Sequence, residues 1–321
     1  MTGKITVQQL RDDLAFGARI GGVTHEVLED AAVREQINQV FEDRGLIVFD
    51  DVEPSGTMHV ALSNVFGPLK DHPSKAVPRV DQDSMPGVID MTCKPFEEGG
   101  IRIGGKTLVS WLPWHFDHAY NNELNRAGVL RALEIPPEGG LTGFTDGIAL
   151  YRMLRPDLRE KIEGKQIVYT LTTQYDHLKF GRPAHYRMIE PKPVSDAFKA
   201  QAAAMSRAVH PAVWTRPTGE KVLHVSHYMA EGILGEENPA GDALLEEVCQ
   251  EVNHLAQECS YHHKWRPGEM IIWDNLRMLH AVSGNRPEDE RLMYRTTIKG
   301  DYGHGRWETT PQGAVTADAM A

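Results

Sequence analysis

Apolar residues spaced three or four apart predict a helix over residues 31–44. Asp30 stands where an N-cap is expected, and Gly45 stands at the C-terminal stop. Similar spacing predicts further helices over residues 57–65, 147–154, 196–205 and 241–256.

Short apolar runs between turn residues predict many β-strands. These runs cover residues 17–23, 46–49, 127–135, 141–145, 168–173 and 292–298. Two hairpins are expected, one joining 212–214 to 222–225 and one joining 261–265 to 270–273. Because strands and helices do not alternate in a βαβ rhythm, the pattern favours a mainly β fold with added helices. We expect a double-sheet jelly roll, also called a double-stranded β-helix.

The chain has 321 residues without an internal repeat or a linker-like change of composition, which favours a single domain over 1–321. We expect its core over about 17–302 and a loose tail from about 308. The glycine-rich stretch 70–110 is either a lid or a surface hairpin. The long polar stretch 174–206 is typical of a functional cover, and we expect a second lid there.

The composition of the chain limits which classes of partner and which cellular compartment fit the protein. The net charge of −11 argues against nucleic acid or an anionic membrane surface as the main partner. Three cysteines without a CxxC pair are typical of free thiols in a reducing cytoplasm. The N-terminal residues resemble no secretory signal, and no apolar run approaches the ~18 residues of a membrane span. We therefore expect a cytoplasmic protein.

The segment Trp114-His115-Phe116-Asp117 carries the first candidate chemistry. On an extended strand, residues two apart project from the same face, so His115 and Asp117 can share one metal ion. His280 is the best candidate for a third ligand. Two histidines and one carboxylate suit Fe(II) and leave coordination positions open. With 15 histidines in the chain, such a pair also arises by chance at a strand end. A zinc hydrolase and a non-catalytic metal- or ligand-binding protein on the same fold are the alternatives.

Five sequence features in a fixed order then resemble one family. They are Phe66-Gly67-Pro68 followed by His72-Pro73, Trp114-His115-x-Asp117, Pro137-x-Gly139-Gly140-x-Thr142, Trp273-Asp274-Asn275 leading to His280, and Arg291 and Arg295 that follow His280 by 11 and 15 residues. From about residue 17 to 302 the chain resembles the taurine and 2,4-dichlorophenoxyacetate dioxygenases. These enzymes depend on Fe(II) and 2-oxoglutarate and have a double-stranded β-helix.

The resemblance implies a reaction and a set of site residues. Fe(II) would be held by His115, Asp117 and His280. The 2-oxoglutarate set would be Thr142, Arg291 and Arg295, with Arg291 on the distal carboxylate. O₂ and 2-oxoglutarate would be consumed, succinate and CO₂ released, and the substrate hydroxylated, with or without cleavage of a C–O, C–S or C–N bond. The resemblance also implies a homo-oligomer.

The expected substrate is a small organic anion that is larger and more apolar than taurine. The candidate substrate-binding residues are His72, Lys75, Trp111, His118, Tyr228, Met229 and Arg295. A second buried guanidinium needs its own anion, so Arg295 is expected to bind the substrate, unless it pairs with a protein carboxylate. On an ideal strand the side chain of His118 points away from the metal, and only its backbone amide lines the site. Trp111 and Tyr228 are expected to stack on an apolar ring.

Overall fold

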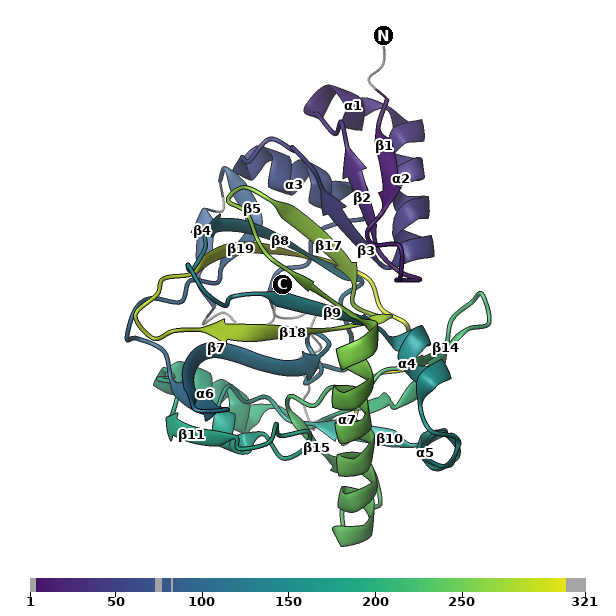
Figure 1. The fold of residues 1–321 in the computed structure, drawn as a ribbon, viewed down its shortest axis with the longest axis vertical. Coiled ribbons are helices and arrows are strands. Elements are labelled where there is room, and N and C mark those ends of the chain that lie inside the picture. Colours follow the sequence, from purple (N-terminus) through teal and green to yellow (C-terminus); the bar gives the residue numbers. More distant parts are fainter. Residues whose placement is uncertain (1–3, 73–76, 82, 310–321) are drawn as a thin grey trace.

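The computed structural model describes residues 4–72, 77–81 and 83–309, and within them two large β-sheets dominate (Figure 1). The first sheet runs in the order β1 (Thr6–Gln9), β2 (Ala18–Gly21), β3 (Leu46–Phe49), β17 (Met270–Asp274), β8 (Ala127–Glu134), β19 (Leu292–Ile298), β5 (Met85–Asp90) and β4 (Arg79–Asp81). The second runs in the order β11 (Arg187–Glu190), β6 (Gly100–Ile103), β7 (Lys106–His115), β18 (Met278–Asn285), β9 (Thr142–Asp146) and β16 (Ser260–His263). The expected mainly β, double-sheet fold is confirmed.

An apolar cluster between the two sheets holds them together. Leu130 and Ile271 of the first sheet pack with Phe144 and Met278 of the second, and all are at least nine-tenths buried. Trp273 belongs to the same cluster. Because this core lies directly beside the inward-facing polar residues of β7 and β18, it fixes the walls of the site described below.

Three N-terminal helices pack against the first sheet, as Figure 1 shows. They are α1 (His25–Glu29), α2 (Ala31–Arg44) and α3 (Gly56–Val65). Asp30 caps α2 by accepting a hydrogen bond from the amide of Ala32 at 2.9 Å, and Gly45 ends it with a left-handed φ of 70°. Ile37 and Phe41 of α2 are fully buried. The predicted helix over 31–44 and both of its ends are confirmed.

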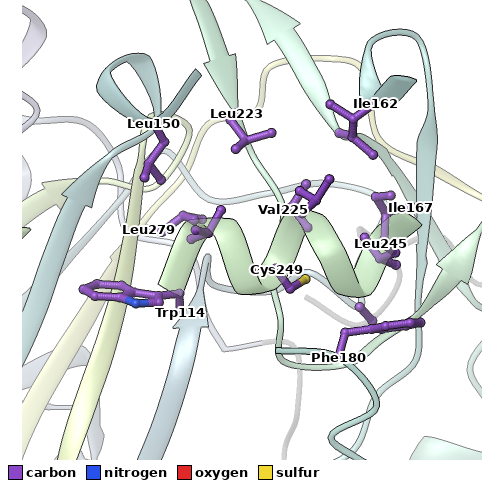
Figure 2. Packing of buried hydrophobic residues seen from close by; sticks show 14 of the residues in the cluster. Trp114, Leu150, Ile162, Ile167, Phe180, Leu223, Val225, Leu245, Cys249 and Leu279 are labelled. Carbon is purple, nitrogen blue, oxygen red and sulfur yellow. The ribbon is translucent and has the colours of Figure 1, made fainter. Parts of the chain in front are cut away.

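A second apolar cluster supports the strands of the site from the other side (Figure 2). It joins the helices α4 (Gly147–Met153), α5 (Pro156–Ile162) and α7 (Pro239–Cys259) to two small sheets. The four-stranded one runs in the order β15 (Ala230–Ile233), β10 (Gln166–Tyr169), β12 (Ala208–Pro211) and β20 (Arg306–Trp307). The two-stranded one pairs β13 (Val213–Thr215) with β14 (Lys221–Leu223). Figure 2 shows Leu245 of α7 beside Ile167, and Cys249 of the same helix between Leu245 and the pair Trp114 and Leu279. Trp114 and Leu279 each precede a candidate metal ligand, so this packing fixes the backbone of both ligand strands.

The two stretches expected to be lids are partly regular structure. Gly104 and Gly105 form the turn of the β6–β7 hairpin, which agrees with the surface-hairpin alternative for part of 70–110. The stretch 174–206 forms η1 (Tyr175–His177), β11 and α6 (Asp196–Ala204), and β11 extends the second sheet beside β6. None of the α6 side chains is fully buried. Residues 73–76 and the tail from 310 lie outside the described residues.

One predicted pairing is wrong. The run 261–265 does not form a hairpin with 270–273, because β16 pairs with β9 in the second sheet and β17 pairs with β3 and β8 in the first. The turn between them therefore carries the chain from one sheet to the other, as a jelly roll requires. Helix α5 and strand β1 were not predicted. Among the described residues, no helix combines the length and the apolar character needed to cross a membrane.

Candidate active site

Strand pairing brings His115 and His280 together. His115 is the last residue of β7, His280 lies in β18, and the two residues are direct partners in the antiparallel ladder. Their ring centroids are 4.0 Å apart. The Nδ1 of His115 donates to the carbonyl of Pro113 at 2.8 Å, which leaves its Nε2 free for a metal ion.

Asp117 completes the cluster from a loop rather than from the strand. It lies two residues past the end of β7, so the expectation that an extended segment aligns it with His115 is only partly correct. Its Oδ1 is 3.6 Å from the Nε2 of His280. One ligand atom from each of His115, Asp117 and His280 lies within 4.8 Å of the others, and all three residues are buried.

The electrostatics of the cluster suit a divalent metal. Burial lowers the pKa of His115 and holds the pKa of His280 well below its ordinary value, so both imidazoles are neutral ligands at pH 7. Burial alone would raise the pKa of Asp117, but the charge of Arg295 outweighs it, holds the pKa below its ordinary value and keeps the carboxylate ionised. Two neutral imidazoles and one carboxylate are the donor set that non-haem Fe(II) uses, so the residues present fit this ion.

Arg295 binds the carboxylate of Asp117, a candidate metal ligand. Its Nη1 and Nη2 donate to the two oxygens of Asp117 at 2.9 and 2.6 Å, and its guanidinium lies over the ring of Trp273. The charge of Arg295 is thus already balanced by a protein carboxylate, which corrects the argument that it needs a second anion. Its Nε is buried without an acceptor among the described residues.

Arg291 lies in the same cavity with no such partner. Its side chain forms no ion pair or hydrogen bond with the described residues, although it is only 7% exposed. Burial lowers its pKa to about 10, so it stays charged at neutral pH. Thr142 also lines this cavity, and its Oγ1 accepts a hydrogen bond from the indole of Trp265 at 2.9 Å. That bond leaves the hydroxyl proton of Thr142 available for donation to a ligand.

All these groups line one cavity of about 270 Å³. Five of the predicted substrate residues line it, namely His72, His118, Tyr228, Met229 and Arg295. Lys75 lies outside the described residues. Sequence reasoning missed a further set of lining side chains that includes Met91, Leu112, Tyr120, Leu171, Tyr175, Lys192 and Phe198. Several of these belong to residues 174–206. The unusual length of that stretch was the only sequence feature that pointed to a role at the site.

Trp111 does not line the cavity and instead packs against Tyr186, with ring centroids 5.7 Å apart. The β7–β18 ladder shifts register between the pairs His280–His115 and Val282–Leu112. This bulge places one extra residue in β7, so Leu112 rather than Trp111 faces the same side as His115. The predicted ring stacking by Trp111 on a substrate is therefore not supported.

His118 adopts a left-handed backbone with φ of 59°, which turns its imidazole into the cavity. The expectation that this side chain points away from the metal is wrong for that reason. Neither ring nitrogen has a hydrogen-bond partner among the described residues, although the side chain is buried. Its ring meets that of His72 edge-on at 5.2 Å. A left-handed histidine and an unsatisfied buried imidazole both cost free energy, which is typical of a functional position.

Comparison with known proteins agrees with this geometry. Residues 6–297 match the family described as "Taurine catabolism dioxygenase TauD, TfdA family". The chain belongs to this family. Among TauD/TfdA relatives, the (S)-phenoxypropionate/alpha-ketoglutarate-dioxygenase of Sphingobium herbicidovorans is 27% identical and covers 90% of this chain and 93% of its own. The alpha-ketoglutarate-dependent 2,4-dichlorophenoxyacetate dioxygenase of Cupriavidus pinatubonensis is also 27% identical, covering 86% and 91%.

A solved structure of a taurine dioxygenase from Burkholderia xenovorans has the same fold, with a TM-score of 0.67 at 23% identity over 99% of each chain. As a member of the TauD/TfdA family, the protein is an Fe(II)- and 2-oxoglutarate-dependent dioxygenase that uses O₂. The zinc hydrolase and the non-catalytic protein are thereby set aside.

Proposed function

We propose that the protein hydroxylates a small organic anion with an apolar body, and that His115, Asp117 and His280 hold the iron. One observation carries the proposal. A buried His-Asp-His cluster, an unpaired buried arginine and apolar walls all face one cavity. In this arrangement the His-Asp-His group would hold the iron that binds the 2-oxo acid end of 2-oxoglutarate, and Arg291 would bind its distal carboxylate. The apolar walls would contact a second molecule, the substrate, beside it.

Arg291 and Thr142 are the groups that we assign to the distal carboxylate of 2-oxoglutarate. A guanidinium offers two parallel N–H donors that match a carboxylate, and binding a carboxylate would compensate the buried charge of Arg291. The hydroxyl of Thr142 adds one donor whose direction is set by Trp265. Together these contacts would orient the co-substrate so that its 2-oxo acid end reaches the iron.

When bound, Fe(II) with O₂ supplies the oxidising power that hydroxylates the substrate while 2-oxoglutarate becomes succinate and CO₂. The chain contributes orientation and the exclusion of water. Leu171, Met229 and Phe198 place apolar surface around the cavity, and Tyr120 and Tyr228 add rings. Burial raises the pKa of both tyrosines, so they remain neutral phenols at physiological pH.

The anionic end of the substrate is assigned to the polar corner formed by His72, His118 and Arg295. Both ring nitrogens of His118 lack a hydrogen-bond partner among the described residues. Two relatives act, by their names, on (S)-phenoxypropionate and 2,4-dichlorophenoxyacetate, which join a carboxylate to an aryl ether. The apolar walls of this cavity suit the same combination of an acid and an apolar body.

The decisive experiment is a succinate-release screen with Fe(II), 2-oxoglutarate and O₂. The panel contains aryloxyalkanoates, alkyl sulfates, sulfonates and N-acyl amino acids, each with a neutral amide or ester of the same shape as its matched control. We expect at least one acid to stimulate succinate formation with a hydroxylated or cleaved product, while its neutral control does not. Stimulation by neutral or cationic compounds alone would contradict the proposal.

A cytoplasmic location and a homo-oligomeric state complete the proposal. Cys93, Cys249 and Cys259 are all free thiols, which suits a reducing compartment. The oligomer rests on the family resemblance alone. Light scattering at micromolar concentration tests it, and a monomeric mass would refute it.

A further inference from the structure

The backbone of Asp117 is held by a side chain, not by a strand. Since β7 ends at His115, the sheet ladder that aligns His115 with His280 does not reach Asp117. Instead, the amide of Asp117 donates to Oδ1 of Asn275 at 2.7 Å, and Nδ2 of Asn275 donates to the carbonyl of Asp117 at 3.2 Å. This donor–acceptor pair is what a neighbouring strand would supply.

We infer that Asn275 is the positioning residue for the metal-binding carboxylate, an inference that rests on the proposed role of Asp117 as a ligand. Two opposed hydrogen bonds to one residue fix the plane of both flanking peptides and therefore the direction of its Cα–Cβ bond. A carboxamide can do this because it carries a donor and an acceptor side by side. Asn275 is fully buried, so water does not compete for these bonds.

Asn275 is itself held on every side. Its main-chain amide donates to the carbonyl of Arg126 at 2.9 Å, and its main-chain carbonyl accepts from Nε2 of His224 at 2.9 Å. Its Nδ2 also lies 3.2 Å from both the carbonyl and the Oδ1 of Asn125. Turning the amide over would place its oxygen against these acceptors and its NH₂ against the Asp117 amide, so the surroundings fix one orientation of the side chain.

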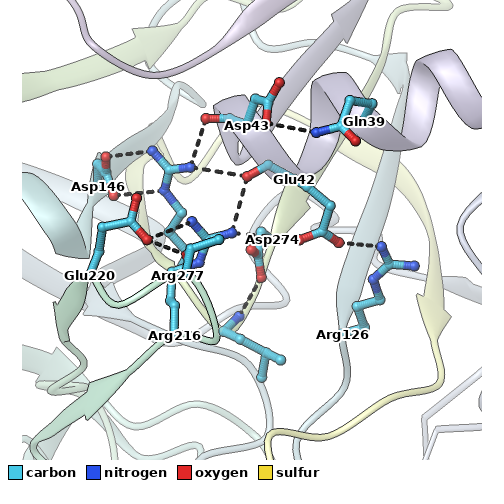
Figure 3. Close-up of polar contacts among 11 residues, drawn as sticks. Gln39, Glu42, Asp43, Arg126, Asp146, Arg216, Glu220, Asp274 and Arg277 are labelled. Carbon is cyan, nitrogen blue, oxygen red and sulfur yellow. Dashed lines mark hydrogen bonds and ion pairs between the residues drawn. The ribbon is translucent and has the colours of Figure 1, made fainter.

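Two neighbours of Asn275 in the turn, Asp274 and Arg277, belong to a network of hydrogen bonds and ion pairs (Figure 3). Arg277 binds both oxygens of Asp146 at 3.0 and 2.8 Å and donates to the carbonyl of Asp43 at the end of α2. Asp274 accepts a hydrogen bond from the amide of Leu276 within the turn. The same turn leads directly into β18, so one short segment places His280 and also orients Asp117.

The test is metal affinity, measured anaerobically with Mn(II) as a probe for the Fe(II) site by electron paramagnetic resonance. We expect Asn275→Ala to weaken Mn(II) binding by about 10- to 100-fold, the usual effect of removing a group that orients a ligand. Asn275→Asp keeps the acceptor for the Asp117 amide and loses the donor, so a smaller but clear loss is expected. This variant carries the test if the alanine variant does not fold.

Asn125→Ala is the matched control. Asn125 is equally buried and bonds to the same network, but its side chain makes no hydrogen bond to Asp117. We expect this variant to lower the thermal unfolding midpoint of the metal-free protein while its Mn(II) affinity stays within about threefold of wild type. Unchanged affinity in both Asn275 variants, or an equal loss in Asn125→Ala, would overturn the inference. A wild-type protein that binds Mn(II) but oxidises no acid would refute the proposed substrate class and leave this inference intact.

Discussion

Arg291 and Arg295 are four residues apart, equally buried and lining the same cavity, yet their surroundings differ. Arg295 forms a two-pronged ion pair with Asp117, whereas Arg291 has no acceptor among the described residues. A buried charge is tolerated only when it is compensated. The paired arginine therefore belongs to the framework of the metal site, and the unpaired arginine marks the place where a ligand brings the opposite charge.

Asp117→Ala removes the partner of Arg295 and should have the largest effect. The variant should lose metal binding and turnover, and it leaves Arg295 buried without a counter-charge. We therefore expect a loss of about 3–5 kcal/mol in the free energy of unfolding of the metal-free protein. His115→Ala should abolish turnover equally but cost much less stability, since it leaves no charge uncompensated. Denaturant unfolding and succinate release measure both effects, and full activity in either variant would refute the ligand assignment.

The unpaired side is tested by Arg291→Met. Losing a charged, two-pronged contact in a shielded pocket should weaken 2-oxoglutarate binding by about 2–5 kcal/mol. Without 2-oxoglutarate, the unfolding free energy should stay the same or rise, because an uncompensated buried charge has been removed. Arg295→Met is the matched control and should destabilise the metal-free protein. An unchanged 2-oxoglutarate requirement in Arg291→Met would show that another group binds the distal carboxylate.

The same contrast holds for two buried acids. Asp117 has a guanidinium on both oxygens, but burial raises the pKa of Asp274 from its ordinary 3.8 to about 6. Between these values the folded protein binds the proton more tightly than the unfolded chain, so this group makes stability fall as pH rises from about 4 to 6. Asp274→Asn keeps an acceptor for the Leu276 amide and cannot ionise. We expect it to flatten this pH dependence and to add up to about 3 kcal/mol at pH 7. Urea unfolding at pH 4, 5, 6 and 7 would show an unchanged slope if this assignment is wrong.

The smallest effect is expected at Thr142, the second residue that we assign to the distal carboxylate of 2-oxoglutarate. Thr142→Val removes one neutral donor, so 2-oxoglutarate binding should weaken by about 1 kcal/mol, or roughly fivefold. Thr142→Ser keeps the hydroxyl and should remain close to wild type. A comparison of apparent KM values for 2-oxoglutarate separates the two variants. Equal values in Val and Ser variants would place the ligand carboxylate beyond the reach of Thr142.

Local sequence signals predicted much of the fold but not all of its pairings. The caps of α2 and the apolar runs of β3, β8 and β19 depend on neighbouring residues, and all were found where expected. The turn over 266–269 has the residues of a hairpin, but its two strands join different sheets. Which strand lies beside β16 depends on the closure of the whole jelly roll, and that is a long-range property.

The site divides in the same way. The three candidate metal ligands, Thr142 and Arg291 come together in one cavity as the motifs indicated. The Arg295–Asp117 pair, the contact of Trp265 with Thr142 and the role of Asn275 arise from residues that meet only in the folded chain. A single bulge in β7 was enough to turn Trp111 away from the cavity, and side-chain alternation counted along the sequence does not reveal such a shift.

The length of chain between the parts of the metal site has a consequence for iron loading. Asp117 and Asn275 are 158 residues apart, so the unfolded chain has no preassembled site and must close a long loop to make one. Metal therefore binds the folded state, and free metal at 100 times its Kd would stabilise the protein by about 2.7 kcal/mol. On the ribosome, a growing chain that already contains His115 and Asp117 still lacks two parts of the site. These are the turn with Asn275, which orients Asp117, and strand β18, which carries His280. The complete set of ligands therefore exists only after synthesis has passed His280.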